Sequence, residues 1–358
     1  MKLGIVGLPN VGKSLLFNAL TRSNVDSANY PFSTVEPNVG IVPVPDVRLH
    51  VLEKMYEAKQ RTHATIEFVD IAGLVKGASQ GQGLGNRFLS HIREVDAIVH
   101  VVRCFNDDNV VHVDGNVSPL RDIETIDLEL ILADAEAIER RLDKVNKALK
   151  ADKSYASEAE LLRRVKDRLE EGRLAKSLEL SEEEASIVQG FGLLTTKPVV
   201  YVANISEEDS GDYIKQVEGY AKEHGSPVLL VRTKIEREIS ELSDEEQEMF
   251  IEEMGLEQSG INRLISVGYE MLGLISFLTA GPKEVRAWTI KRDTKASGAA
   301  GKIHSDIERG FIRAEVVPFE ALEQAGSYTA AKEKGVVRLE GRDYPVKDGD
   351  VILFRHNT

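Results

Sequence analysis

The sequence contains one cysteine, Cys104, and only 6% aromatic residues. A single cysteine permits no intrachain disulfide and fits a reducing compartment. No apolar run approaches the 18 residues of a membrane-spanning helix, and the N-terminal MKLGIVGLPN has too few apolar positions for a signal peptide. We therefore expect a cytoplasmic protein without a membrane partner.

Positive charge is also scarce. Lysine and arginine number 45 against 59 aspartates and glutamates, which gives a formal net charge of -14. This balance argues against broad electrostatic coating of nucleic acid, so any RNA contact must be local and no DNA partner is expected. The 358 residues, 42% of them hydrophobic, are enough for two or three domains with proper cores.

The first part of the chain alternates short strands with helical patterns. The runs KLGIVG, VGIVPV, ATIEFVDIAG and AIVHVVRCF read as strands, which predicts a mostly parallel sheet covered by helices. From about Asp122 to Leu180 apolar residues recur at three- and four-residue steps in a highly charged background, broken once at KADKSYAS. This pattern predicts an antiparallel helical hairpin. A solvated hairpin without chemistry and a partner-binding arm both remain open.

The strand pattern resumes at KPVVYVAN and SPVLLVRT, so the hairpin is an insertion. Ser181 with Glu184, and Ser243 with Glu246, have the spacing of capping boxes that open two further helices. After about Ala280, short strands such as VRAWTI and DVILFRH predict a separate C-terminal domain. The expected domains are residues 1–119 with 191–278, 120–190, and 279–358.

The segment GLPNVGKS, from Gly7 to Ser14, has the G-x-x-x-x-G-K-[ST] spacing of a phosphate-binding loop. It follows a strand and precedes a helical pattern, which is the context that the motif requires. Backbone N–H groups wrap phosphates at such a helix start, the lysine reaches the β- and γ-phosphates, and the serine ligates Mg²⁺. We assign phosphate binding to Asn10, Val11, Gly12, Lys13, Ser14 and Leu15, a catalytic role to Lys13 and a metal-ligand role to Ser14.

Two further segments predict a nucleotide switch. In FVDIAG, Asp70 and Gly73 have the D-x-x-G spacing that sets a carboxylate beside the metal, through water, and an amide beside the γ-phosphate. Thr34 lies where a switch loop can bring a hydroxyl to Mg²⁺. Leu74 follows, where Ras-like proteins use a glutamine to orient water. Either hydrolysis is very slow, or another residue or a partner positions the water.

The base site reads Asn204-Ile205-Ser206-Glu207 where a GTPase carries Asn-Lys-x-Asp. The carboxylate of Glu207 is one methylene further out than that of aspartate, so the guanine clamp is misplaced. Asn204 can pair with purine N7 and an exocyclic amine, and Ile205 supplies an apolar wall. These residues favour ATP over GTP, with a GTPase of the same fold as the alternative. Phe105 is either the opposite wall or a core residue.

Several long motifs resemble the YchF family of Obg-like ATPases: GLPNVGKS, NYPFSTVEPNVG, DIAGLVKGASQGQGLGNRFL, HVDGNVSP and KEVRAWTI with GKIHSDIERGFIRAEV. The resemblance implies a Ras-like α/β domain, a helical arm and a C-terminal TGS domain of ubiquitin-like β-grasp fold. It also implies ATPase activity, ribosome association and a role in translation or stress response. In this family Asn-x-x-Glu marks adenine preference.

The resemblance also bears on two loop residues. His112 lies in a family motif whose histidine is assigned a catalytic role, and an imidazole there could orient water. Asn10 resembles the asparagine that potassium-activated relatives use to hold K⁺.

The C-terminal region gathers basic residues around one tryptophan, which suits either an RNA surface or an ordinary solvated sheet face. They are Arg286, Trp288, Lys291, Arg292, Lys295, Lys302, Arg309 and Arg313. A nucleotide-stabilised ribosome- or RNA-binding protein with incidental turnover is therefore a second alternative.

Overall fold

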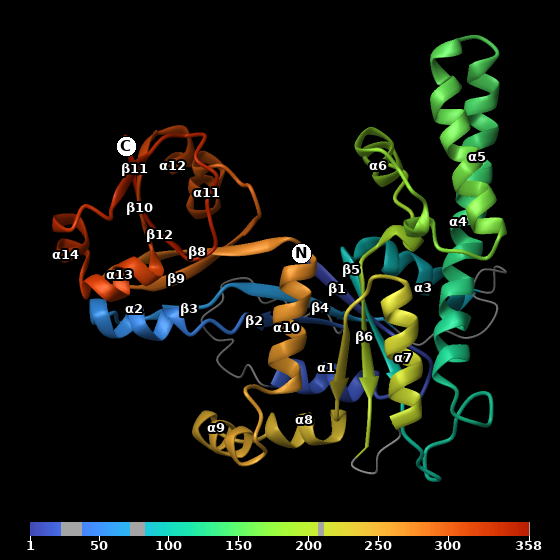
Figure 1. Ribbon diagram of the computed structural model, residues 1–358, viewed down its shortest axis with the longest axis horizontal. Coiled ribbons are helices and arrows are strands. Elements are labelled where there is room, and N and C mark those ends of the chain that lie inside the picture. Colours follow the sequence, from blue (N-terminus) through green and yellow to red (C-terminus); the bar gives the residue numbers. More distant parts are fainter. Residues whose placement is uncertain (23–37, 72–82, 207–210, 358) are drawn as a thin grey trace. The chain divides into compact units, whose positions relative to one another are not determined.

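The computed structural model describes residues 1–22, 38–71, 83–206 and 211–357 (Figure 1). The chain forms two compact units. The first comprises Met1–Gly40 with Glu67–Leu264, and the second comprises Ile41–Ile66 with Ile265–Thr358.

A six-stranded sheet of order β2-β4-β1-β5-β6-β7 organises the first unit. Its strands are, in that order, Val39–Pro43, Thr65–Asp70, Lys2–Val6, Ala97–Arg103, Val199–Asn204 and Val228–Val231. From β4 to β7 all neighbours pair in parallel. A central parallel strand is covered on both faces, and all seven residues of β5 are buried. The predicted parallel α/β domain is confirmed.

Helices lie between these strands and after the last of them. They are α1 Lys13–Arg22, α3 Gly83–Glu94, α7 Gly211–Glu223, α8 Thr233–Ile239, α9 Asp244–Glu253 and α10 Gly260–Met271. The predicted capping box at Ser243 opens α9, where the Ser243 N–H donates to Glu246 Oε2 at 2.9 Å. No helix of the described ranges is long and apolar enough to cross a membrane.

A helical hairpin is inserted between β5 and β6. It consists of α4 Pro119–Leu149, η3 Lys153–Tyr155 and α5 Ala156–Glu170, and Figure 1 shows α4 and α5 side by side. Buried Ile138 and Val145 of α4 share one core cluster with Leu162 and Val165 of α5. Arg141 and Glu158 form an ion pair of 2.8 Å across the hairpin. The predicted antiparallel hairpin is confirmed.

The chain returns to β6 through η4 Ala175–Ser177, α6 Glu182–Gln189 and η5 Leu194–Thr196. The predicted capping box at Ser181 and Glu184 opens α6. Asp134 of α4, 1% exposed, fixes the end of this return. Its carboxylate accepts from the Leu194 N–H at 3.0 Å, the Thr195 N–H at 2.8 Å and the Thr195 hydroxyl at 2.7 Å. One carboxylate therefore ties the middle of α4 to the segment that returns to β6.

A mixed sheet of order β11-β10-β12-β8-β9-β3 organises the second unit. Its strands are Arg338–Glu340, Phe311–Pro318, Asp350–His356, Leu274–Ala280, Val285–Lys291 and Arg61–Thr62. Ala296, Ala299 and Ala300 of α11 Ala296–Ile303 pack with Phe277 and Phe354 of the sheet, as in the predicted β-grasp fold. The other helices are α2 Arg48–Tyr56, α12 Ser305–Arg309, α13 Phe319–Ala325 and α14 Tyr328–Glu333.

The packing differs from the predicted domain ranges at two places. Residues 41–66 and 265–278, expected in the P-loop domain, belong to the second unit. Strand β3 pairs in parallel with β9, and Arg48 Nη1 donates to Asp348 Oδ2 at 2.8 Å. These pairings join segments far apart in the chain, which strand runs alone do not indicate. The extent of the hairpin domain, 120–190, stays a prediction.

The Asp134 anchor gives a stability prediction. Asp134→Ala leaves two buried N–H groups and one hydroxyl without an acceptor, so we expect the free energy of unfolding to fall by about 3 kcal/mol. The control is Asp143→Ala, an exposed aspartate on the same helix. Urea unfolding followed by circular dichroism measures both. Equal effects of the two substitutions would contradict the anchoring role.

Candidate functional site

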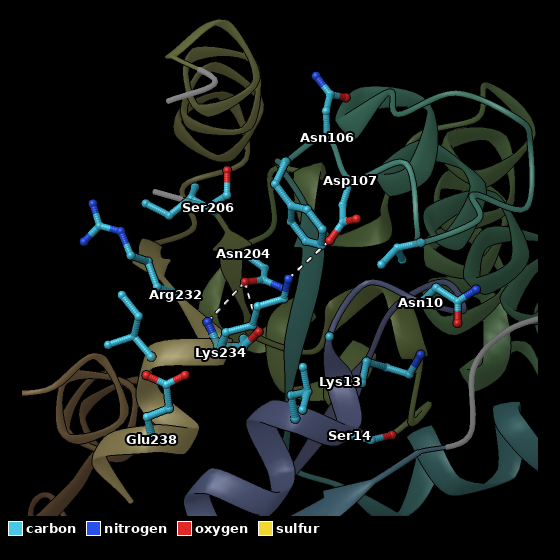
Figure 2. Close-up of a pocket in the computed structure, with 17 residues that line it drawn as sticks. Asn10, Lys13, Ser14, Asn106, Asp107, Asn204, Ser206, Arg232, Lys234 and Glu238 are labelled. Carbon is cyan, nitrogen blue, oxygen red and sulfur yellow. Dashed lines mark hydrogen bonds and ion pairs between the residues drawn. The ribbon is translucent and has the colours of Figure 1, made fainter. Parts of the chain in front are cut away.

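The carboxyl ends of the parallel strands meet at one edge of the first sheet. Open α/β sheets bind ligands in the crevice outside this edge. A cavity of about 670 Å³ lies there (Figure 2). It is lined by Asn10, Gly12, Lys13, Ser14, Leu15, Phe105, Asn106, Asp107, Val110, Asn204, Ile205, Ser206, Arg232, Thr233, Lys234, Ile235 and Glu238.

The segment from Gly7 to Ser14 joins β1 to α1 through backbone conformations that favour glycine. Gly12 has a φ of +105°, and a Cβ there would lie 2.4 Å from Asn204 Nδ2. The Leu16 N–H donates to the Gly12 carbonyl at 3.0 Å, so the helical bonding of α1 begins within the loop. The free N–H groups and the positive dipole end of the helix therefore open onto the cavity. This geometry is that of a phosphate-binding loop.

Lys13 and Asp70 carry opposite charges beside this loop. Lys13 Nζ donates to the Leu8 carbonyl at 2.8 Å. Burial lowers the pKa of Lys13 to about 8, against the opposing effect of Asp70. Burial likewise raises the pKa of Asp70, against the effect of Lys13. Asp70 Oδ1 is buried and has no hydrogen-bond partner among the described residues.

These two groups, with the exposed Ser14, fit a metal-bound triphosphate. Within the described ranges the Lys13 ammonium bonds one carbonyl, and an anion can satisfy it better, as a metal-bound water can satisfy the orphaned carboxylate oxygen. Ser14 offers a hydroxyl at the cavity wall. The residues present are therefore suited to Mg²⁺ with phosphate.

Asn204 joins three segments of the site. Its Nδ2 donates to the Val11 carbonyl at 2.8 Å, and its Oδ1 accepts from the Thr233 N–H at 3.2 Å and the Thr233 hydroxyl at 3.1 Å. Both lone pairs of Oδ1 are used, and one Nδ2 hydrogen has no acceptor among the described residues. Asn204 can thus donate to a ligand but has no acceptor left for an exocyclic amine, which differs from the dual pairing that we expected.

The remaining walls come from the loops after β5 and β7. Phe105 and Ile205 line the cavity, as expected. Asp107 and Lys234, which line it too, form an ion pair of 3.2 Å (Figure 2). The sequence does not predict this pairing, because it joins residues far apart in the chain.

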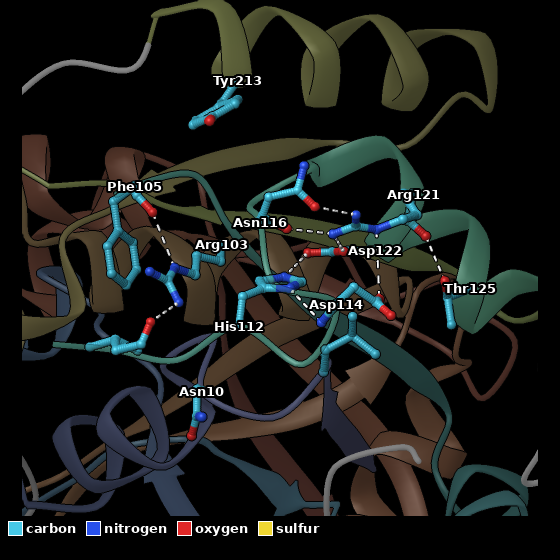
Figure 3. Close-up of polar contacts among 12 residues, drawn as sticks. Asn10, Arg103, Phe105, His112, Asp114, Asn116, Arg121, Asp122, Thr125 and Tyr213 are labelled. Atoms are coloured by element: carbon cyan, nitrogen blue, oxygen red, sulfur yellow. Dashed lines mark hydrogen bonds and ion pairs between the residues drawn. The ribbon is translucent and has the colours of Figure 1, made fainter. Parts of the chain in front are cut away.

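His112 lies beside this cavity but does not line it. Only 7% of the residue is exposed, and Nε2 bonds Asp122 Oδ2 at 2.9 Å while Nδ1 accepts from the Asp114 N–H at 3.1 Å (Figure 3). Both ring nitrogens are therefore engaged. Asn10 Nδ2 donates to the Val111 carbonyl at 3.0 Å, which ties the P-loop to the residue before His112.

Four of the predicted site residues lie outside the described part of the chain. They are Thr34, Gly73, Leu74 and Glu207. Their assigned roles stay predictions.

Carboxylates pair with several of the basic residues of the second unit. Lys295 lies 2.7 Å from Asp343, and Arg309 pairs with Asp306. Arg286 stacks over Trp288, with its Cζ 4.1 Å from the ring centroid. The RNA surface suggested by these residues stays a prediction.

The parallel sheet and the phosphate-binding loop define a P-loop NTPase. A family model described as a 50S ribosome-binding GTPase matches residues 2–149. A second model, the C-terminal YchF GTPase model described as a protein of unknown function, matches residues 274–357.

Comparison with full-length relatives identifies the family within this class. A protein from Bacillus subtilis named Ribosome-binding ATPase YchF is 54% identical, with 99% of each chain covered. A protein of the same name from Escherichia coli is 50% identical over 100% of this chain and 99% of its own. The structure of the Schizosaccharomyces pombe YchF GTPase matches with a TM-score of 0.90, 36% identity, and coverage of 99% of this chain and 97% of that one. The chain belongs to the YchF family.

The buried lysine gives a pH-dependence prediction. The folded-state pKa of Lys13, about 8, is below its unfolded value, so the unfolded chain binds more protons above pH 8 and stability gains a favourable contribution as pH rises. Relative to Lys13→Met, the ligand-free parent should gain about 1–2 kcal/mol of unfolding free energy between pH 7.5 and 10. Denaturant titrations at both pH values measure the difference. A constant difference would contradict the lowered pKa.

Proposed function

We propose that the protein is a cytoplasmic, ribosome-associated ATPase that binds and hydrolyses ATP in the cavity at the carboxyl edge of its first sheet. The observation that carries the proposal is the phosphate-binding loop at a cavity with apolar Ile205 and Phe105 at its base end. The names of the bacterial relatives support ATP hydrolysis and ribosome binding.

The P-loop would bind the phosphate end of the nucleotide. Lys13 would exchange the Leu8 carbonyl for phosphate oxygens, and the start of α1 would receive the remaining negative charge. Ser14 and Thr34 would hold Mg²⁺, with Asp70 bonded through water; when bound, this ion neutralises charge on the β- and γ-phosphates. The orphaned Asp70 Oδ1 supports this arrangement.

The base end selects a purine and then adenine. The remaining Nδ2 hydrogen of Asn204 suits purine N7, which adenine and guanine share. Discrimination must therefore come from the neighbouring residues. The sequence has Ile205 where the guanine clamp has a lysine, and Glu207, which is one methylene longer, where the clamp has an aspartate.

The hydrolysis step requires a change at His112. With Nε2 bonded to Asp122 and Nδ1 accepting from Asp114, the imidazole offers no free site to a water molecule. His112 would orient water only after leaving Asp122, which makes turnover slow until a partner such as the ribosome moves the loop. Asn10 bonds Val111 through Nδ2, and no described residue bonds its Oδ1, which would therefore serve as a ligand for K⁺.

A GTPase of the same fold is the second candidate, because the yeast structure and the N-terminal family model carry that name. Parallel titration with Mg·ATP and Mg·GTP decides between them. We expect ATP to bind more tightly, and the double variant Ile205→Lys with Glu207→Asp to narrow or reverse the preference. Glu218→Asp, an exposed glutamate on α7, is the control and should leave the preference unchanged. Equal affinities of the parent for both nucleotides would refute adenine selection.

The role of His112 is tested separately from binding. His112→Ala should slow single-turnover ATP hydrolysis roughly 100-fold or more and leave ATP affinity nearly unchanged, since an acid–base group acts on the chemical step. His91→Ala, at an exposed position of α3, is the matched control. If the hydrolysis rate of His112→Ala equals that of the parent, both alone and with ribosomes, another group positions the water.

A further inference from the structure

Arg103, the last residue of β5, is a buried cation that none of the described carboxylates pairs with as an ion pair. Only 2% of the residue is exposed. Burial lowers the pKa of its guanidinium, against the opposing effects of Asp107 and Asp122, and arginine remains protonated at neutral pH. A buried charge is costly unless it is well hydrogen-bonded, so the contacts of this guanidinium show what it stabilises.

Three backbone carbonyls of one loop accept hydrogen bonds from the guanidinium. Nε donates to the Phe105 carbonyl at 3.1 Å, Nη1 to the Val110 carbonyl at 2.9 Å and Nη2 to the Asp107 carbonyl at 3.2 Å. The planar group also lies over the Phe105 ring, with Cζ 4.7 Å from its centroid (Figure 3). Residues 104–107 form no helix or strand. The guanidinium N–H groups therefore bond loop carbonyls that backbone N–H groups would bond in regular secondary structure.

The same loop forms one wall of the cavity. Phe105, Asn106, Asp107 and Val110 line it. The backbone of Arg103 pairs with that of Asn204, so the loop begins directly beside the residue that meets the base. From there Asp107 reaches Lys234 on the opposite side of the pocket.

We propose that Arg103 is the positioning residue of the base wall. It shapes the loop from Phe105 to Val110 around its guanidinium and thereby sets the affinity for the nucleoside part of the ligand, without touching the phosphates. This inference rests on the proposed function, namely that the cavity binds ATP.

Two ligands distinguish binding at the base wall from binding at the phosphate cradle. They are Mg·ATP and Mg·tripolyphosphate, which carries the phosphates without a nucleoside. Arg103→Met removes all three donors at similar length, so ATP affinity should fall at least about tenfold while tripolyphosphate affinity changes less than about twofold. Arg103→Lys keeps the charge but cannot reproduce the planar fork, and should give an intermediate loss of ATP affinity. Arg163→Met, at an exposed position of α5, is the control and should change neither affinity.

Each outcome has a distinct meaning. Equal losses for the two ligands, or no loss of ATP affinity in either variant, would overturn the inference. If Arg103→Met does not fold, the ratio of the two affinities in Arg103→Lys decides. A parent protein that binds ATP no better than tripolyphosphate would instead refute the proposed function, because the nucleoside would then contribute nothing.

Discussion

The side-chain amide of Asn204 is the contact on which the rest of the site depends. It bonds the P-loop through the Val11 carbonyl and the start of α8 through Thr233, while its backbone belongs to β6. Gly12 packs so closely against it that no side chain fits between them. Each of these buried hydrogen bonds contributes about 1 kcal/mol, but breaking them would leave several polar groups unsatisfied together. The Asn204 amide consequently holds the phosphate cradle and the base wall together as one assembled body.

The residues that line the cavity and the residue assigned to hydrolysis, His112, are held in different ways. The cavity residues face a common space, whereas His112 is held by Asp122 and lies outside its lining. Burial shifts the pKa values of Lys13 and Asp70 toward their neutral forms, and functional sites trade stability for binding through such buried charges. The slow turnover that we propose in the absence of a partner follows from this division and agrees with Leu74 at the sequence position of the usual glutamine.

Much of the fold and of the candidate site could be predicted because the features concerned are contiguous in the sequence. The P-loop needs one strand, eight residues and one helix, and the helical hairpin needs only its apolar period, so both could be read from sequence. The role of Arg103 could not, because three carbonyls of an irregular loop give no residue-type signal. The same holds for Asp107 with Lys234, and for β3 with β9, since these contacts join distant segments. The two hydrogen bonds accepted by Asn204 Oδ1 from Thr233 were likewise invisible, and they change what Asn204 can offer to a base.

Hydrogen–deuterium exchange with and without Mg·ATP tests the central claim most directly. If one preassembled site spans the carboxyl edge of the sheet, ATP should slow exchange together in the P-loop from Gly7 to Leu15, in the loop from Phe105 to Val110 and around Thr233. Protection should appear at a single ATP concentration range for all three segments. Protection confined to the P-loop, or absent from it, would contradict the account.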